Sequence, residues 1–368
     1  MTTKFFTAIL ALLLAGPVAA ATPTATPAPV ETTDTAALLK AAGTAYEQKD
    51  YHKARELYER AAAAGDAHAQ VFLGLFHERG LGVKQDLAKA RALYERAAAA
   101  GSADAQNNLG FLYLKGNGVK QDYGEAQKWF TKAAAGGSAN GQANLGYLYG
   151  RGLGVKQDYI KARELYEQAA AAGQADAKNY LGYLYSQGLG VKQDYAKARE
   201  WYEQAAAAGN QEAQYRLATI YAKGQGVAQN QAKALELYER AAAAGSADAQ
   251  NKLGVIYAKG QGVKQDYAKA RQWYEQAAKA GDVSAQYNLG LLYAKGQGVK
   301  QDYGRARQWF AKAAGAGDAS AQYNLGALYF LGQGVKKDVA EARRWFEKAA
   351  AQGDRDAQQA LQKIRGQN

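Results

Sequence analysis

The stretch GVKQDYAKARQWYEQAAKAG, residues 262–281, decides the fold, because its parts recur along most of the 368-residue chain. Its first five residues occur again without change at positions that begin at Gly82, Gly118, Gly154, Gly190 and Gly298. Other glycines keep the same spacing of 36 residues, and they are Gly74, Gly110, Gly146, Gly182, Gly254, Gly290 and Gly326, with Ala218 in the one missing place. A fixed period of this length is typical of repeat architectures. We therefore expect an array of repeats rather than a single globular domain.

Each repeat contains two segments in which apolar residues lie three and four positions apart. Residues 248–260, DAQNKLGVIYAKG, carry the stripe Ala249, Leu253, Ile256 and Tyr257. Residues 266–281 carry the stripe Ala270, Trp273, Tyr274 and Ala277. This spacing predicts two amphipathic helices, and so a helical hairpin. One hairpin cannot bury both stripes alone, so we expect an all-α, right-handed superhelical solenoid of stacked helix-turn-helix repeats.

The repeat pattern also predicts how the chain is divided. We expect a shortened first repeat at residues 36–65, eight repeats of 36 residues at 66–353, and a C-terminal capping helix and tail at 354–368. The terminal units of an array are atypical because one of their faces has no neighbour.

The N-terminal residues predict export. Residues 1–21 contain Lys4, an apolar run over residues 5–15, and small residues that predict cleavage after Ala21, with a cut after Ala20 as the alternative. Residues 22–35 form a Pro/Thr-rich leader that we expect to be flexible. The apolar run is shorter than the roughly 20 residues of a spanning helix, so no transmembrane segment is expected in the mature chain. The periplasm is the expected location, with secretion as the alternative.

The repeated GVKQD segment has the composition of a turn followed by a helix cap. Asp266 lies where an N-cap residue belongs, and Gly260 and Gly262 give the backbone freedom that a turn needs. In the divergent repeat the segment reads GVAQN, so Asn230 replaces the aspartate and no lysine is present. Asparagine caps a helix as well as aspartate but carries no charge. The segment is therefore interpreted as a structural joint, and its lysine as a contribution to solubility and weak electrostatic steering.

No motif in the sequence indicates catalysis, a cofactor or a metal. The three histidines are His52, His68 and His77, and the HExxH zinc pattern fails because Leu81 stands where its second histidine belongs. His77 takes a place that other repeats fill with tyrosine, so a core position is expected. No phosphate-binding loop, GxSxG motif or SxxK motif is present. We expect no catalytic residue, no cofactor and no metal ligand, and hence a protein that is not an enzyme.

The charge of the chain is positive but spread out. The net charge is +12, or +11 without Lys4, which is about one excess charge for each repeat. Nucleic acid binding would need concentrated basic stripes, so no nucleic acid partner is expected. An acidic protein or an anionic envelope polymer would be attracted by such a field, and solubility explains the charge equally well.

Positions that differ between repeats point to a partner-binding surface. The positions equivalent to 71, 72, 75 and 78 change freely, whereas those equivalent to Ala69, Leu73 and Gly74 hardly change. Their spacing places them on one face of the first helix of each hairpin. The candidate partner-binding residues are Asn144, Tyr147, Asn179, Tyr180, Tyr183, Tyr215, Arg216, Asn251 and Lys252. We expect a site centred on Tyr147, Tyr183 and Arg216, and the alternative is that the tyrosines pack between neighbouring first helices.

The pattern A-x-x-x-L-G-x-x-Y, G-x-G-V-x-x-D and A-x-x-W-Y/F-x-x-A-A-x-x-G resembles the Sel1-like repeat, a relative of the tetratricopeptide repeat. The shortened first unit is more similar to a tetratricopeptide repeat. The resemblance implies a non-catalytic adaptor that holds a partner protein or peptide on the concave face of a solenoid, in envelope or host-contact processes. A cysteine-rich subfamily implies penicillin binding or β-lactamase activity as an alternative, and this chain has no cysteine. Binding of a cell-wall glycan, peptidoglycan, is the other alternative.

Overall fold

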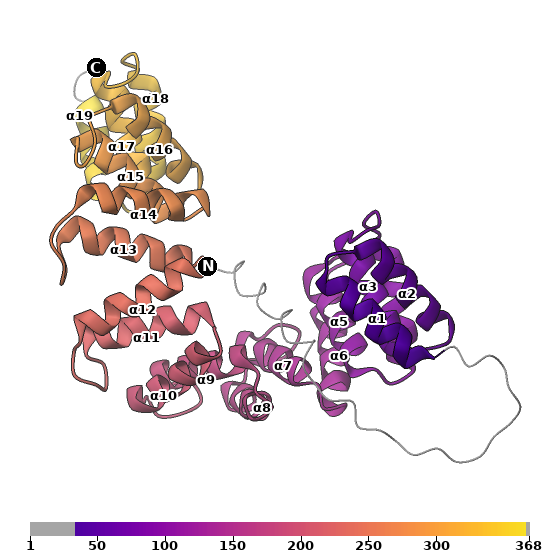
Figure 1. The fold of residues 1–368 in the computed structure, drawn as a ribbon. Coiled ribbons are helices and arrows are strands. Elements are labelled where there is room, and N and C mark those ends of the chain that lie inside the picture. The colour runs from indigo at the N-terminus through magenta and orange to yellow at the C-terminus, as the bar shows by residue number, and fades with distance from the viewer. Residues whose placement is uncertain (1–33, 366–368) are drawn as a thin grey trace, which may run out of the picture. The chain divides into compact units, whose positions relative to one another are not determined.

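The computed structural model describes residues 34–365. The predicted signal peptide, residues 1–21, lies outside this range, as do residues 22–33 of the predicted leader. Within the described range the chain forms nineteen helices and no strand, which confirms the all-α fold (Figure 1). The helices are α1 (Thr35–Glu47), α2 (Tyr51–Ala63), α3 (Ala67–Arg79), α4 (Leu87–Ala99), α5 (Ala103–Lys115), α6 (Tyr123–Ala135), α7 (Ala139–Arg151), α8 (Tyr159–Ala171), α9 (Ala175–Gln187), α10 (Tyr195–Ala207), α11 (Gln211–Lys223), α12 (Gln231–Ala243), α13 (Ala247–Lys259), α14 (Tyr267–Lys279), α15 (Val283–Lys295), α16 (Tyr303–Gly315), α17 (Ala319–Leu331), α18 (Val339–Ala351) and α19 (Arg355–Arg365).

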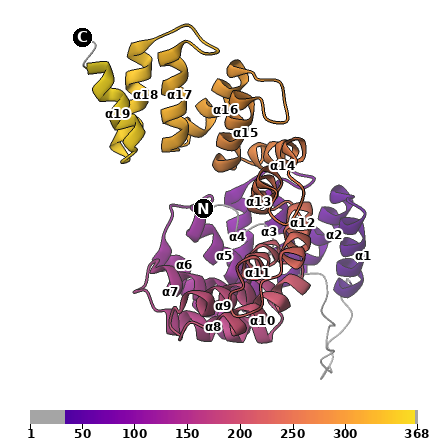
Figure 2. The ribbon, with the colours of Figure 1, turned by 90° about the vertical axis from the view of Figure 1, so that its left-hand side faces the viewer.

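The chain divides into two compact units, and the boundary between Ala205 and Ala206 falls inside α10. Unit 1 contains α1 to α9 and most of α10, and unit 2 contains α11 to α19. Within each unit an odd-numbered helix and the even-numbered helix after it form a hairpin, and each hairpin packs on the next. The stack from α13 to α18 can be followed in Figures 1 and 2, and it ends with α19 on α18. These stacked pairs confirm the predicted solenoid.

Helix starts follow the predicted capping chemistry. The Lys269 N–H donates to Asp266 Oδ1 over 2.9 Å, so Asp266 is the N-cap of α14. In the divergent repeat, Asn230 accepts from the Lys233 N–H at the same distance, 2.9 Å. An uncharged amide thus caps α12 as the aspartate caps α14. The capping interpretation is confirmed.

A glutamine holds the loop inside seven of the hairpins, from α3–α4 to α15–α16. Gln265 Nε2 donates to the Ala258 carbonyl oxygen, at 2.8 Å, and the Asp266 N–H donates to the Tyr257 carbonyl oxygen, at 2.9 Å. Carbonyl groups in the last turn of a helix have no partner within that helix. The same glutamine bond recurs in the loops that contain Gln85, Gln121, Gln157, Gln193, Gln229 and Gln301. The loop therefore closes the end of the first helix.

The second glycine of each loop joins neighbouring hairpins. Gly190 has φ +66°, and a methyl group on it would lie 2.7 Å from the carbonyl carbon of Tyr159, at the start of the second helix of the preceding hairpin. Gly154 approaches Tyr123 in the same way, at 2.6 Å. A side chain at either position would clash with backbone atoms. The interpretation of GVKQD as a structural joint is confirmed, and the joint also connects adjacent repeats.

In most hairpins the core pairs a glycine of the first helix with an aromatic ring of the second. In the α5–α6 hairpin, Gly110 lies against the ring of Phe130, which is fully buried. Ala126 and the larger Leu114, Leu145 and Leu148 pack in the same cluster as the ring. With no disulfide to hold it, this close packing stabilises the array.

Candidate functional site

The first-helix face is the side of each unit that is formed by the first helices of its hairpins. In unit 1 these are α1, α3, α5, α7 and α9, and in unit 2 they are α11, α13, α15 and α17. All nine predicted partner-binding residues lie on these helices. They fall into two groups, one in each unit.

In unit 1, two predicted amides are buried. Asn144 is 4% exposed, and its Nδ2 donates to Asn107 Oδ1 of the neighbouring first helix over 2.8 Å. Asn179 is 2% exposed, and its Oδ1 accepts no hydrogen bond within the described chain. Both amides lie beneath the surface as the structure stands. Their part in partner binding stays a prediction.

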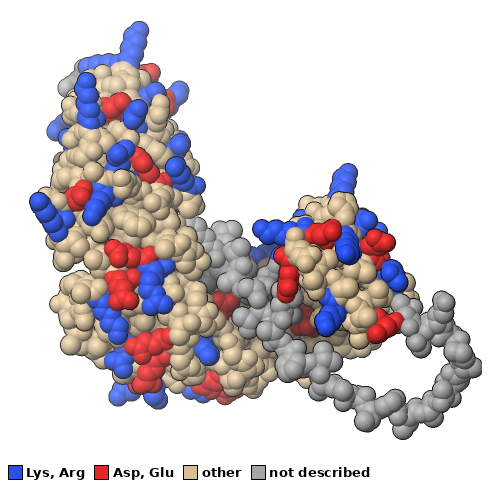
Figure 3. Space-filling view, in the orientation of Figure 1, with Lys and Arg blue, Asp and Glu red and all other residues tan. Residues whose placement is uncertain are grey.

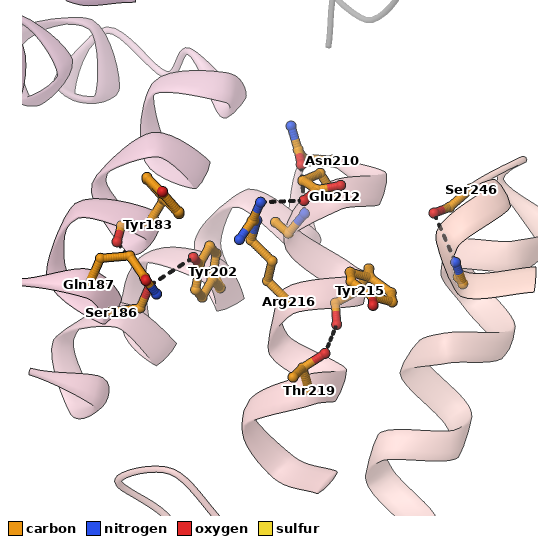
Figure 4. Close-up of polar contacts among 12 residues, drawn as sticks. Tyr183, Ser186, Gln187, Tyr202, Asn210, Glu212, Tyr215, Arg216, Thr219 and Ser246 are labelled. Carbon is orange, nitrogen blue, oxygen red and sulfur yellow. Dashed lines mark hydrogen bonds and ion pairs between the residues drawn. The ribbon is translucent and has the colours of Figure 1, made fainter. Parts of the chain in front are cut away.

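The tyrosines of unit 1 lie at different depths. Tyr180 is half-buried, and its ring stacks on Tyr166 of the preceding hairpin with the centroids 4.8 Å apart. The ring centroids of Tyr147 and Tyr180, on neighbouring first helices, lie 6.3 Å apart. Arg151 Cζ lies over the Tyr147 ring, 5.8 Å from its centroid. Tyr183 is 37% exposed and is drawn on α9 in Figure 4. Tyr183 is therefore the most accessible aromatic side chain among the predicted residues of this unit.

In unit 2, Tyr215 packs inward while Arg216 pairs along its helix. The Tyr215 ring lies 5.6 Å from Tyr238 of the second helix, and burial raises the pKa of Tyr215 to about 12. Arg216 Nη2 lies 2.7 Å from Glu212 Oε1, an ion pair drawn in Figure 4. Burial raises the pKa of Glu212, and Arg216 opposes this shift. This stretch of α11 is polar, and the charges of Arg216 and Glu212 neutralise each other.

The remaining two predicted residues lie next to each other on α13. Asn251 accepts a hydrogen bond from Asn288 Nδ2 of the neighbouring first helix, at 3.3 Å. Lys252 is half-buried. Amide pairs thus link neighbouring first helices in both units, Asn107 with Asn144 and Asn251 with Asn288.

Three buried tyrosines have polar partners on the first helices that were not predicted from the sequence. Tyr94 O–H donates to Glu78 Oε2 at 2.7 Å, Tyr202 lies 3.5 Å from Ser186 Oγ, and Tyr238 lies 3.0 Å from Thr219 Oγ1. Where the second helix carries phenylalanine, as at Phe130, the residue in the place of Glu78 is Leu114, which is apolar. In other hairpins the place of Glu78 holds Gly150 with Tyr166 and Ala258 with Tyr274, so the sequence carried no consistent signal for these hydrogen bonds. Part of the variation on the first-helix face therefore serves the core.

A depression of about 650 Å³ lies beside the loop of the α7–α8 hairpin, away from the predicted site. Ile160 at its rim is 55% exposed, and Lys161 lies over the Tyr149 ring at 4.4 Å. The residues around it are Tyr149, Val155, Lys156, Gln157, Asp158, Tyr159, Ile160, Lys161 and Gly190. These residues belong to the repeated loop that joins neighbouring hairpins, so the structural role of the loop explains why they lie together.

The structure brings together no candidate metal site within residues 34–365, because no three His, Cys, Asp or Glu side chains lie close enough to hold an ion. No helix in this range combines the length and apolar character that a membrane crossing requires. His77 is 4% exposed, so the expected core position is confirmed. Lysine and arginine alternate with acidic residues over the visible face of each unit in Figure 3.

Comparison with known proteins identifies the repeat. The family model described as Sel1 repeat matches residues 37–66, 67–102, 103–138, 139–174, 175–210, 211–246, 247–282, 283–318 and 319–354. A Sel1 repeat protein from Oxalobacter formigenes is 35% identical, with 96% of this chain and 99% of that chain covered and a TM-score of 0.64. A protective antigen present in uropathogenic Escherichia coli strains, which displays an SLR fold, is 37% identical, with 91% of this chain and 80% of that chain covered and a TM-score of 0.58. No curated protein matches the chain.

Sel1 repeat proteins generally mediate protein–protein interaction, and they are generally scaffolds rather than enzymes. The family matches run without a gap from residue 37 to residue 354, in register with the helical hairpins. The chain belongs to the Sel1 repeat family.

Proposed function

We propose that this chain is a non-catalytic scaffold that is exported and binds partner proteins or peptides on its first-helix face. The observation that carries the proposal is the contrast between a constant core and a variable first-helix face. Glycine, alanine and leucine positions repeat with the period, whereas the first helices present Tyr183, Arg216 and Lys252 at least partly at the surface. Tyrosine and arginine are enriched where proteins bind one another.

Export is part of the proposal, and the periplasm is the proposed location. It is supported by the sequence of residues 1–21, with Lys4 before an apolar run and small residues at the expected cleavage point. Cell fractionation followed by N-terminal sequencing tests it. We expect a mature chain that begins at Thr22, and a full-length chain in the cytoplasmic fraction would contradict export.

Site-specific photo-crosslinking tests the binding face. A photoreactive residue at Tyr183 is compared with one at Glu164, an exposed position on the second helix α8 of the same unit. We expect discrete crosslinked products in the native cell from position 183 and none from position 164. Equal products from both positions, or none from either, would contradict a partner surface on the first helices.

Two further assays test the other candidate functions. Hydrolysis of a chromogenic β-lactam that a point mutation abolishes would contradict the non-catalytic assignment. Co-sedimentation with purified peptidoglycan that depends on Tyr183 would move the proposal from a protein partner to a cell-wall glycan.

A further inference from the structure

Lys252 is an unpaired cation on the first-helix face of unit 2. It lies in the middle of α13, it is half-buried, and none of the ion pairs formed within residues 34–365 includes it. Burial lowers the pKa of Lys252, and the positive charges of Lys223 and Lys259 lower it further. Lys252 and Lys259 lie two turns apart on one face of α13, and Lys223 holds the position of Lys259 one repeat earlier, at the end of α11.

Helix ends explain two of these lysines but not the third. Lys223 is the last residue of α11 and Lys259 is the last residue of α13, and both are exposed. A cation at a helix C-terminus is stabilised by the helix dipole. Lys252 lies two turns before the end of its helix, where the dipole gives no such stabilisation. Half-burial of an ammonium group beside like charges is unfavourable unless an anion offsets it.

The neighbouring acidic residues do not supply that anion. Asp248 lies four residues before Lys252, a spacing that allows an ion pair on a helix, but no such pair forms. The charge of Asp248 instead acts on α11, where it raises the pKa of Glu212 and of Tyr215. Glu212 is already paired with Arg216. Arg216 occupies the position of Lys252 one repeat earlier. Its ion pair shows that a cation at this position can be neutralised within its own helix, whereas the charge of Lys252 is not neutralised in this way.

We infer that Lys223, Lys252 and Lys259 hold an acidic segment of the partner protein, one that carries several Asp or Glu side chains. The inference rests on the proposed function, because it names the chemistry of a partner on the same face. Lys252 and Lys259 are seven residues apart, so their positions are separated by about 10 Å along α13. An extended peptide presents alternate side chains roughly 7 Å apart, so two or more carboxylates can reach the three ammonium groups. The adjacent Asn251 and Asn288 amides add hydrogen-bonding groups beside them.

A segment with several carboxylates fits this arrangement better than a single small anion. The three cations are spread along two helices rather than gathered around one point. They are all lysines, which act as separate point charges and lack the planar fork with which arginine binds a phosphate group in two places.

The test measures binding of a fluorescein-labelled peptide of alternating Glu and Gly to the purified chain by fluorescence anisotropy. The matched peptide contains Gln in place of Glu. Lys252→Met keeps the length and apolar stem of the side chain while removing its charge. Lys264→Met removes the same charge from an exposed loop position in the same unit, and circular dichroism verifies that both variants are folded.

We expect the Glu peptide to bind, the Gln peptide not to bind, and Lys252→Met to weaken binding by about fivefold or more while Lys264→Met leaves it nearly unchanged. Affinity should fall between about 20 mM and about 150 mM salt. An equal loss from both variants would mean that only the net charge attracts the peptide, and this would overturn the inference. Complete displacement of the peptide by a few millimolar inorganic phosphate would overturn it too, in favour of a small-anion site. If the peptide result is negative while crosslinks from position 183 persist, the acidic partner is wrong and the proposed function stands.

Discussion

Gly110 lies directly against the ring of Phe130, and a methyl group on Gly110 would be 2.6 Å from both Cδ1 and Cε1 of that ring. The ring is fully buried and cannot turn aside. The glycine therefore holds the two helices of the hairpin at the separation that the ring needs. The same pair recurs in most of the other hairpins, for example between Gly182 and Tyr202, whereas α11 carries Ala218 at this position.

Replacing Gly110 with alanine is expected to destabilise the chain by about 1–3 kcal/mol, because the added methyl group overpacks the core. Helix propensity alone predicts the opposite sign, since alanine is favoured over glycine by roughly 1 kcal/mol in a helix interior. Gly43 is the matched control, because it lies inside α1 and a methyl group there meets no atom within 4 Å. We expect Gly43→Ala to be neutral or stabilising. Urea midpoints followed by circular dichroism provide the measurement, and a rise for Gly110→Ala would contradict the packing argument.

The loop glutamine is expected to matter more than the loop lysine. Gln265 donates to the Ala258 carbonyl oxygen and to Tyr267 Oη, at 2.8 and 3.1 Å, whereas Lys264 is exposed. Gln265→Ala should lower stability by about 0.5–1.5 kcal/mol because the end of α13 loses a hydrogen-bond donor. Lys264→Ala should leave the urea midpoint within experimental error. Equal effects of the two substitutions would show that the glutamine does not close the loop.

The partly buried pair of Tyr94 and Glu78 allows a double-mutant cycle. Glu78→Leu removes the acceptor of the Tyr94 hydroxyl group, so it should cost about 1–3 kcal/mol. The double variant Glu78→Leu with Tyr94→Phe reproduces the apolar combination of Leu114 and Phe130 found one repeat later. It should recover most of the lost stability. Additive losses in the double variant would mean that the hydrogen bond does not couple the two residues.

The stability of unit 1 is expected to fall in mild acid because of His77. Burial lowers the pKa of His77 from 6.5, Lys89 and Arg55 lower it, and Asp86 and Glu59 oppose them. Its Nδ1 has no hydrogen-bond partner within the described chain. Since the folded-state pKa lies below the unfolded value, the unfolded chain binds the proton more readily. The contribution of neutral His77 to the free energy of unfolding is complete above pH 6.5. It is lost progressively as the pH falls below that value.

Unfolding of His77→Tyr between pH 7.5 and pH 5 measures this effect. Tyrosine is the residue of the equivalent position in other repeats, for example Tyr113. The variant should show a smaller loss of stability over this range than the original chain. His52→Asn, at an exposed position, should keep the original pH dependence. The same slope in His77→Tyr as in the original chain would assign the pH dependence to other groups.

The sequence by itself determined the period, the helical hairpins and the helix caps. These features depend on local chemistry: apolar spacing within one helix, glycine where the backbone must turn, and Asp266 or Asn230 before a helix start. The nine candidate partner-binding residues could also be placed on the first helices, because helical spacing alone assigns residues to one face of a helix.

Only the tertiary structure decided which residues of that face reach the surface. Asn144 and Lys252 occupy the same position of the repeat, three repeats apart. Asn144 is buried against Asn107 of the neighbouring helix, whereas Lys252 is half-buried and takes part in none of the ion pairs of residues 34–365. The exposure of a side chain at this position depends on the residues that the adjacent hairpin places beside it, and these belong to another repeat of the sequence. Local pattern therefore predicts the array, and contact between repeats decides which of its side chains are exposed.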